Sequence, residues 1–162
     1  MINCGIIGFG KMGQIRAKAI EASGLGRVSA ICDVSLPDDP PYAVAETSAA
    51  ILQTPEIDAV FVCTPNHLIP TLCIDALRAG KHVFSEKPPG FNANQVREVI
   101  AAEQAAQGRK LMYGFNHRHH ESIMRMKEIV DDGALGRVLW MRGRYGKEVD
   151  PSYFDGWRAK PK

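Results

Sequence analysis

The chain has 162 residues, of which 45% are hydrophobic and 23% charged, and its formal net charge is +2. These values are typical of a globular protein of about one domain with a proper core. Residues 1–108 carry a charge of −3 and residues 109–162 one of +5. Because the basic residues are interspersed with apolar ones, the pattern argues against a nucleic-acid partner and would equally suit an anionic substrate or a cofactor phosphate.

Neither the cysteines nor the apolar runs point to export or to a membrane. The four cysteines lack metal-ligand spacing, and we expect them to be reduced and structural. No apolar run reaches transmembrane length, and the apolar residues at the N-terminus belong to a predicted strand rather than to a signal peptide. We therefore expect a cytoplasmic protein without a membrane partner.

The first thirteen residues combine a predicted strand, a glycine-rich turn and the start of a helix. In Gly-x-Gly-x-x-Gly, Gly8 allows a tight turn, Gly10 lets a pyrophosphate approach the backbone, and Gly13 lets the helix pack on the strand. The free N–H groups of the helix N-terminus favour a phosphate. An ordinary glycine turn is the alternative. The residues predicted to contact a dinucleotide here are Gly8, Phe9, Gly10, Lys11, Met12 and Gly13.

A second apolar run, residues 28–32, ends at Asp33, twenty positions after Gly13. A carboxylate at this position accepts hydrogen bonds from both ribose hydroxyls and repels a 2′-phosphate. The expected cofactor is therefore NAD, with NADP as the alternative.

The next stretch contains the least regular part of the chain. Prolines forbid regular structure in residues 36–41, so we expect a loop where a crossover helix usually lies. Residues 42–45 are a candidate strand, and residues 48–53 a short helix ended by Thr54-Pro55.

From residue 58 to about residue 133, predicted strands and helices alternate. The continuous apolar character of residues 58–63 is typical of a parallel strand buried on both faces. Periodicity and stop signals predict the other elements: helices over 69–80, 94–107 and about 123–133, and strands over 82–85 and 110–113.

This alternation predicts an α/β fold with a doubly wound parallel sheet, the Rossmann arrangement. Right-handed crossovers place the ends of the strands along one edge, where ligands bind in such folds. The residues at this edge are Gly8, Asp33, Thr64, Glu86 and Asn116. Residues 138–145 alternate like one strand of a different sheet, which is not stable alone. We therefore divide the chain into a dinucleotide-binding domain over 1–118 and the beginning of a second domain over 119–162.

The motifs together resemble the Gfo/Idh/MocA family of oxidoreductases. The matching segments, which cover nearly the whole chain in order, are residues 8–13, 64–66, 79–83, 86–88, 114–118, 133–138 and 157–158. The resemblance implies a Rossmann domain followed by a larger α+β substrate domain that often forms homo-oligomers through its sheet.

The resemblance also assigns Lys87, in Glu86-Lys87-Pro88, as the catalytic lysine beside the nicotinamide and the substrate hydroxyl. Pro88 favours an extended Lys87, and a lysine there can donate to an oxygen or share in proton transfer. The alternative is a surface lysine beside a turn.

Further site residues follow from the same resemblance. Thr64, Pro65 and Asn66 would line the cofactor groove, although Pro-Asn also favours a plain turn. Trp157 and Arg158 would contact the nicotinamide carboxamide, or form a rim aromatic and a solvated arginine. We interpret Asn116 and Arg118 as lining the cleft, with Arg118 near substrate or cofactor.

The histidines of residues 117–120 do not predict a metal site. Adjacent histidines point in different directions, and no carboxylate or cysteine spacing completes a ligand set. We expect His119 and His120 at the surface.

Three departures from the family pattern matter. A proline loop replaces the helix before the third strand, Ile69 stands where a histidine is common, and the chain stops before the family's Gly-Gly-rich segment, aspartate and histidine. The missing histidine is the usual acid–base partner of the lysine. The sequence thus looks like the N-terminal part of an oxidoreductase whose substrate domain continues beyond it.

The expected activity is hydride transfer between a secondary hydroxyl of a sugar, inositol or sugar derivative and the nicotinamide. The rival interpretation of the 162-residue chain itself is a catalytically incompetent dinucleotide-binding module.

Overall fold

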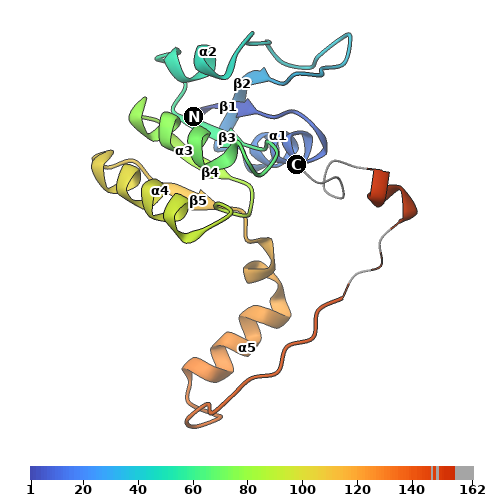
Figure 1. The fold of residues 1–162 in the computed structure, drawn as a ribbon, viewed down its shortest axis with the longest axis vertical. Helices are drawn as coiled ribbons and strands as arrows, with labels where there is room; N and C mark the ends of the chain where they lie inside the picture. Colours follow the sequence, from blue (N-terminus) through green and yellow to red (C-terminus); the bar gives the residue numbers. More distant parts are fainter. Residues whose placement is uncertain (147, 149, 156–162) are drawn as a thin grey trace. The chain divides into compact units, whose positions relative to one another are not determined.

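The computed structural model describes residues 1–146, 148 and 150–155 (Figure 1). The chain divides into two compact units, Met1–Asn116 and His117–Lys162, each described by itself. The first unit contains the strands β1 (Ile2–Ile7), β2 (Gly26–Cys32), β3 (Ala59–Val62), β4 (His82–Ser85) and β5 (Leu111–Tyr113) and the helices α1 (Lys11–Ser23), α2 (Ser48–Gln53), α3 (Ile69–Arg78) and α4 (Ala93–Ala105). The 3-10 helices are η1 (Asn116–His119) and η2 (Pro151–Asp155), and α5 spans Glu121–Asp131.

The five strands form one parallel sheet in the order β2-β1-β3-β4-β5. Ile7, the last residue of β1, pairs with Cys32 on one side and with Val62 on the other. From β1 the chain winds outward to β2 and then returns to build the other half from β3 onward. The strand order therefore reverses between β1 and β3, and the crevice outside their carboxyl ends is where ligands bind in doubly wound folds. The sheet confirms the predicted fold class.

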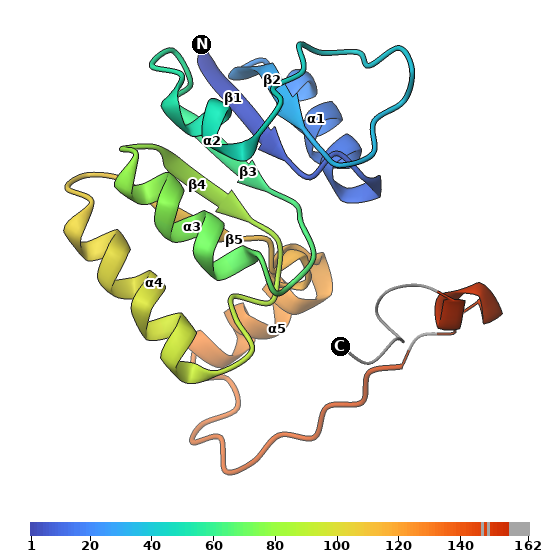
Figure 2. The same cartoon turned by 45° about the horizontal axis from the view of Figure 1, so that its top comes forward.

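Helices cover both faces of the sheet, with α1 on one and α2, α3 and α4 on the other (Figures 1 and 2). Successive residues of a strand point to opposite faces. Ile6 accordingly belongs to the cluster beneath α1, and Ile7 to the cluster beneath α2–α4. Burying each such side chain contributes about 1.5–3 kcal/mol. The two clusters fix the position of the glycine turn that follows β1.

Side chains define the starts of two helices. The Thr47 hydroxyl accepts a hydrogen bond from the Ala50 N–H at 3.1 Å at the start of α2. The Asn92 side chain accepts one from the Gln95 N–H at 3.0 Å at the start of α4. These are N-caps, which satisfy N–H groups left without intrahelical partners.

The irregular stretch between β2 and α2 has no helix, as expected from its prolines. The predicted strand over 42–45 is wrong, because only one isolated bridge forms there, between Val44 and Ile31. Its two hydrogen bonds join the Ile31 N–H to Ala43 O and the Ala45 N–H to Ile31 O, at 2.9 and 2.8 Å. Residues 43–45 therefore contact β2 only at Ile31. The chain then continues into α2.

The second unit begins with η1 and α5. Residues 138–145 form no strand, in agreement with the expectation that one strand of that sheet is not stable alone. The N–H and C=O groups of a strand need hydrogen-bond partners on a neighbouring strand, and a single strand has no such neighbour. On α5, ion pairs join Arg125 to Glu128 at 2.9 Å and Lys127 to Asp131 at 2.5 Å. Within the described residues, no helix has the length and apolar character needed to cross a membrane.

Candidate functional site

The glycine turn after β1 is shaped by close backbone contacts. Gly8 has φ +93°, and a Cβ there would lie 2.6 Å from the Cys63 carbonyl oxygen. A Cβ at Gly13 would overlap the Gly8 carbonyl oxygen, whereas one at Gly10 would meet no atom within 4 Å. Gly8 and Gly13 are therefore required by the fold itself. Gly10 leaves open space beside the backbone, as an approaching pyrophosphate requires.

The N-terminus of α1 opens onto this turn. Gly10 is the N-cap residue, so no side chain caps the helix, and the first turn carries no acidic residue. The first intrahelical bond joins the Gln14 N–H to Gly10 O at 3.0 Å. The N–H groups of Lys11, Met12 and Gly13 in the first turn are thus available to an external acceptor, and the helix dipole favours an anion there.

Asp33 lies directly against the glycine turn. Its Oδ2 accepts a hydrogen bond from the Phe9 N–H at 2.5 Å, and its Oδ1 accepts one from the Ser35 N–H at 3.0 Å. The Gly8 N–H also donates to Cys32 O at 2.8 Å. The end of β2 and the glycine turn therefore form one unit, with the carboxylate beside the open space at Gly10.

The other members of the predicted glycine-turn set differ in exposure. Phe9 is only 5% exposed and packs edge-on against Tyr42, with ring centroids 5.9 Å apart. Its side chain is part of the core beneath α1, so only its backbone faces the turn. Lys11 is exposed and Met12 half-buried.

Thr64, Pro65 and Asn66 form the connection from β3 to α3. The Leu68 N–H donates to Pro65 O at 3.0 Å, and the Ile69 N–H donates to Asn66 O at 3.4 Å. The segment is therefore a turn, next to Gly8 on the opposite side from Asp33. Within the described residues, the buried Thr64 Oγ1 has no hydrogen-bond partner. A buried hydroxyl without a protein partner is unusual in a native fold, and this one lies just past the carboxyl end of β3, where ligands bind in doubly wound folds.

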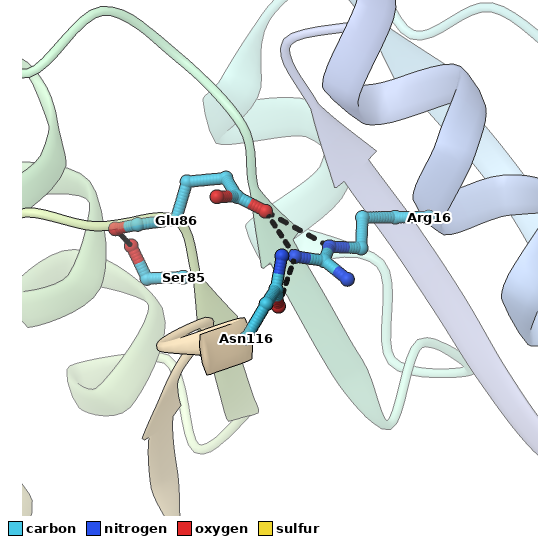
Figure 3. Close-up of polar contacts among 4 residues, drawn as sticks. All are labelled: Arg16, Ser85, Glu86 and Asn116. Atoms are coloured by element: carbon cyan, nitrogen blue, oxygen red, sulfur yellow. Dashed lines mark hydrogen bonds and ion pairs between the residues drawn. The ribbon is translucent and has the colours of Figure 1, made fainter. Parts of the chain in front are cut away.

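The end of β4 carries an ion pair that joins three segments (Figure 3). Arg16 of α1 donates to Glu86 Oε1 from Nε at 2.9 Å and from Nη2 at 2.5 Å, and Nη2 also donates to Asn116 Oδ1 at 3.1 Å. The Arg16 and Glu86 side chains are 14% and 10% exposed. Lys87 follows Glu86, is exposed, and is joined to Pro88 by a cis peptide bond.

The cysteines near the site are free thiols, as the spacing predicted. Burial, reinforced by the Glu86 carboxylate, raises the pKa of Cys63 to about 12. Burial also raises the pKa of Cys32. Because a thiolate is the reactive form, neither thiol is a nucleophile near neutral pH.

The remaining predicted residues lie elsewhere in the chain. Arg118 is exposed in the second unit, in η1. The His117 and His120 rings stack with centroids 5.0 Å apart, and His120 is the N-cap of α5. No group of three potential metal ligands occurs in the described part of the chain. Trp157 and Arg158 lie outside the described residues.

Two structurally important residues escaped the sequence analysis. Arg16 is three residues past Gly13, about one helical turn into α1, and its residue type alone does not indicate a buried ion pair. Lys81 is 6% exposed, and its Nζ donates to Thr54 O and Ile57 O at 2.7 and 2.8 Å. The sequence feature that could have indicated a buried Lys81 is its position between a helix and a buried strand. Its acceptors could not be identified in this way, because they are more than twenty residues away in the sequence.

The strand order of the parallel sheet reverses at an open glycine turn, and an uncapped helix N-terminus and a carboxylate lie beside that turn. These features together define a dinucleotide-binding domain of the Rossmann type. The chain belongs to the Gfo/Idh/MocA family, because residues 2–115 match the family described as an oxidoreductase family with an NAD-binding Rossmann fold.

The relatives of this chain include dehydrogenases of inositol and of levoglucosan. The inositol 2-dehydrogenase of Rhizobium meliloti is 33% identical over 142 residues, which are 85% of this chain and 43% of that protein. The levoglucosan dehydrogenase of Pseudarthrobacter phenanthrenivorans is 34% identical over 113 residues, which are 67% of this chain and 28% of that protein.

A solved structure matches the fold over the same region. It is scyllo-inositol dehydrogenase from Lactobacillus casei with bound NAD(H) and scyllo-inositol, with a TM-score of 0.76 and 30% identity. The match covers 84% of this chain and 42% of that one. The chain thus spans less than half the length of the relatives that it matches over most of its own length.

Proposed function

We propose that the protein containing this chain is an NAD-dependent dehydrogenase that oxidises a secondary hydroxyl of an inositol, sugar or sugar derivative. The observation that carries the proposal is the uncapped N-terminus of α1, which opens beside Gly10 where a Cβ would meet no atom. The NAD-binding family and the inositol dehydrogenases among its relatives support the substrate class.

The proposed cofactor site follows the carboxyl edge of the sheet. The residues expected to hold NAD are Gly8, Phe9, Gly10, Lys11, Met12, Gly13, Asp33, Thr64, Pro65, Asn66, Glu86, Lys87, Asn116, Trp157 and Arg158. The α1 N–H groups would bind the pyrophosphate, and Asp33 the ribose hydroxyls. Since Asp33 would repel a 2′-phosphate, we propose NAD rather than NADP.

Lys87 is the proposed catalytic residue, and Arg118 a proposed substrate contact. Bound NAD supplies a nicotinamide that accepts hydride at C4. Lys87 Nζ would donate a hydrogen bond to the reacting oxygen and help to move the hydroxyl proton. The exposure of Lys87 next to a buried, anchored Glu86 supports this role, because the ammonium can reach a bound substrate while its backbone stays fixed.

We further propose that residues 119–162 begin a substrate domain, that the protein is cytoplasmic, and that it self-associates through the sheet of that domain. The second candidate function is a dinucleotide-binding module without catalysis. The short span of the chain relative to its relatives favours this candidate for the 162 residues taken alone.

Intact mass followed by calorimetric titration with NAD and NADP tests the cofactor site. We expect saturable NAD binding and weaker NADP binding by the 162-residue chain. Absence of binding for both nucleotides would refute the proposed function.

A dehydrogenase assay with inositols and related sugars separates the two candidate functions. NADH formation at 340 nm with one of these polyols supports the enzyme. NAD binding without turnover of any polyol favours the binding module.

A further inference from the structure

We propose that Arg16 is a positioning residue for Lys87, acting through Glu86. It holds the Glu86 carboxylate from α1 and so fixes the backbone from which Lys87 reaches the reacting oxygen. This inference rests on the proposed function for the catalytic importance of Lys87, but the positioning itself is a property of the apo protein.

The first step is the contact between Arg16 and Glu86. Two guanidinium nitrogens, Nε and Nη2, converge on Glu86 Oε1 at 2.9 and 2.5 Å. Charge-assisted hydrogen bonds of this kind are roughly twice as strong as neutral ones and hold Glu86 Oε1 against α1. Nη2 also donates to Asn116 Oδ1 at 3.1 Å, so the guanidinium links the ends of β4 and β5 (Figure 3).

The second step is the anchoring of the Glu86 backbone. The Glu86 N–H donates to Val62 O at 2.9 Å, and the Ser85 hydroxyl donates to Glu86 O at 3.1 Å. Ser85 is fully buried. The carbonyl that precedes Lys87 is therefore fixed from within the fold, while Arg16 fixes the side chain of the same residue. Glu86 is buried and Lys87 is exposed, so the side chain of Glu86 faces inward and that of Lys87 outward.

The third step is the packing around the guanidinium. Arg16 lies over the Phe84 ring at 4.8 Å from its centroid, a cation–π contact. A Cβ at Gly114 would lie 3.0 Å from Arg16 Nη2 and 3.4 Å from Glu86 Oε1. Gly114 therefore leaves room for the ion pair and for little else. This explains why the glycine precedes the Phe115-Asn116 segment at the end of β5.

A purely stabilising role accounts poorly for this arrangement. Buried ion pairs often contribute little net stability, because desolvation offsets the attraction. This pair instead connects α1 to the segment that carries the proposed catalytic lysine. Because Nε and Nη2 are committed to Glu86, Arg16 is also poorly placed to bind a cofactor phosphate.

The test measures the reactivity of Lys87 in the apo protein by trace acetylation and mass spectrometry, with Lys110 as the internal reference. In Arg16→Met the Glu86 side chain loses its anchor on α1, so the segment that carries Lys87 is released and the Lys87 ammonium can turn toward the unpaired carboxylate. We expect the relative rate at Lys87 to fall by about fivefold, the factor of a modest ion pair. The matched control is Lys18→Met, which removes an exposed positive charge from the same helix.

Arg16→Lys covers the case in which Arg16→Met does not fold. It keeps the charge but loses the two-nitrogen contact, so we expect a smaller fall in the rate at Lys87, with Lys18→Arg as its control. Circular dichroism verifies that each variant is folded. An unchanged Lys87 rate in folded Arg16 variants, or an equal fall in the Lys18 variants, would overturn the proposal.

The outcome is separable from that of the proposed function. Acetylation needs neither NAD nor substrate, so a protein that binds no NAD refutes the dehydrogenase and leaves the labelling result valid. In a protein with dehydrogenase activity, Arg16→Lys is expected to lower kcat while leaving KM for NAD unchanged. A change confined to KM would instead assign Arg16 to cofactor binding and overturn the positioning role.

Discussion

The Asp33 carboxylate accepts a hydrogen bond from the Phe9 N–H at 2.5 Å and so joins the end of β2 to the glycine turn. Its other oxygen is held by the Ser35 N–H at 3.0 Å. Each carboxylate oxygen has two lone pairs, so both retain capacity for a ribose hydroxyl. Asp33 thus orders the turn before any cofactor arrives, and the same group is the proposed determinant of cofactor choice.

Asp33→Asn and Asp33→Ala test that choice. Asn keeps an oxygen for Phe9 but loses the negative charge, so we expect NAD affinity to fall by about tenfold and the preference over NADP to shrink. Calorimetric titration with both nucleotides gives the ratio, and Glu98→Gln on α4 is the control for loss of one negative charge. If the ratio of the affinities for NAD and NADP in both variants equals that of the unsubstituted protein, Asp33 does not select the cofactor.

Two alanine substitutions in the glycine turn are expected to separate folding from binding. Gly13→Ala places a Cβ against the Gly8 carbonyl oxygen and should lower the thermal midpoint and NAD affinity together. Gly10→Ala points into open space and should keep the thermal midpoint but weaken NAD binding. Thermal unfolding and NAD titration of the two proteins decide the matter. Normal NAD affinity in Gly10→Ala would argue against a pyrophosphate at this turn.

Lys81 is expected to be a structural residue. Its ammonium satisfies the carbonyls of Thr54 and Ile57, so Lys81→Met should cost about 2–3 kcal/mol in the free energy of unfolding. Urea denaturation measures the loss, and Lys110→Met, at an exposed lysine, is the control. Equal stability of the two variants would mean that the buried ammonium contributes little.

Stability is expected to fall at alkaline pH because of the buried thiols. Burial raises the pKa of Cys4 from 9.0 to about 11 and that of Cys63 from 9.0 to about 12. Above pH 9 the unfolded thiols lose protons that the folded ones keep, so the free energy of unfolding decreases as pH rises. Below pH 9 this contribution is fully present. Urea denaturation from pH 8 to pH 11 measures the slope.

Cys63→Ala is the matched variant for this pH dependence. Removing one of the two thiols with the largest shifts should make the decline between pH 9 and pH 11 shallower. A slope identical to that of the unsubstituted protein would assign the alkaline instability to other groups.

The sequence predicted the elements of the first unit well because their signals are local. Gly8, Gly10 and Gly13 predicted the turn and the close contacts at Gly8 and Gly13, and the apolar period of residues 69–77 predicted α3. The prolines of residues 36–41 correctly excluded a helix. The prediction of a strand over 42–45 failed, because an apolar run forms a strand only where a partner strand is available along its length. Residues 138–145 form no strand, as expected of a single strand without the rest of its sheet.

The sequence by itself therefore determined the doubly wound parallel fold, the glycine turn and the placement of Asp33 at the same sheet edge, since alternating strands and helices with right-handed crossovers bring the strand ends to one edge. Only the tertiary structure decided that Phe9 turns its ring into the core and that Glu86 is held by Arg16. It also decided that Lys81 is buried. These contacts join residues between 24 and 70 positions apart. The sequence around a charged residue does not identify the group that it will contact. That partner is set by burial and geometry, which exist only once the sheet has formed.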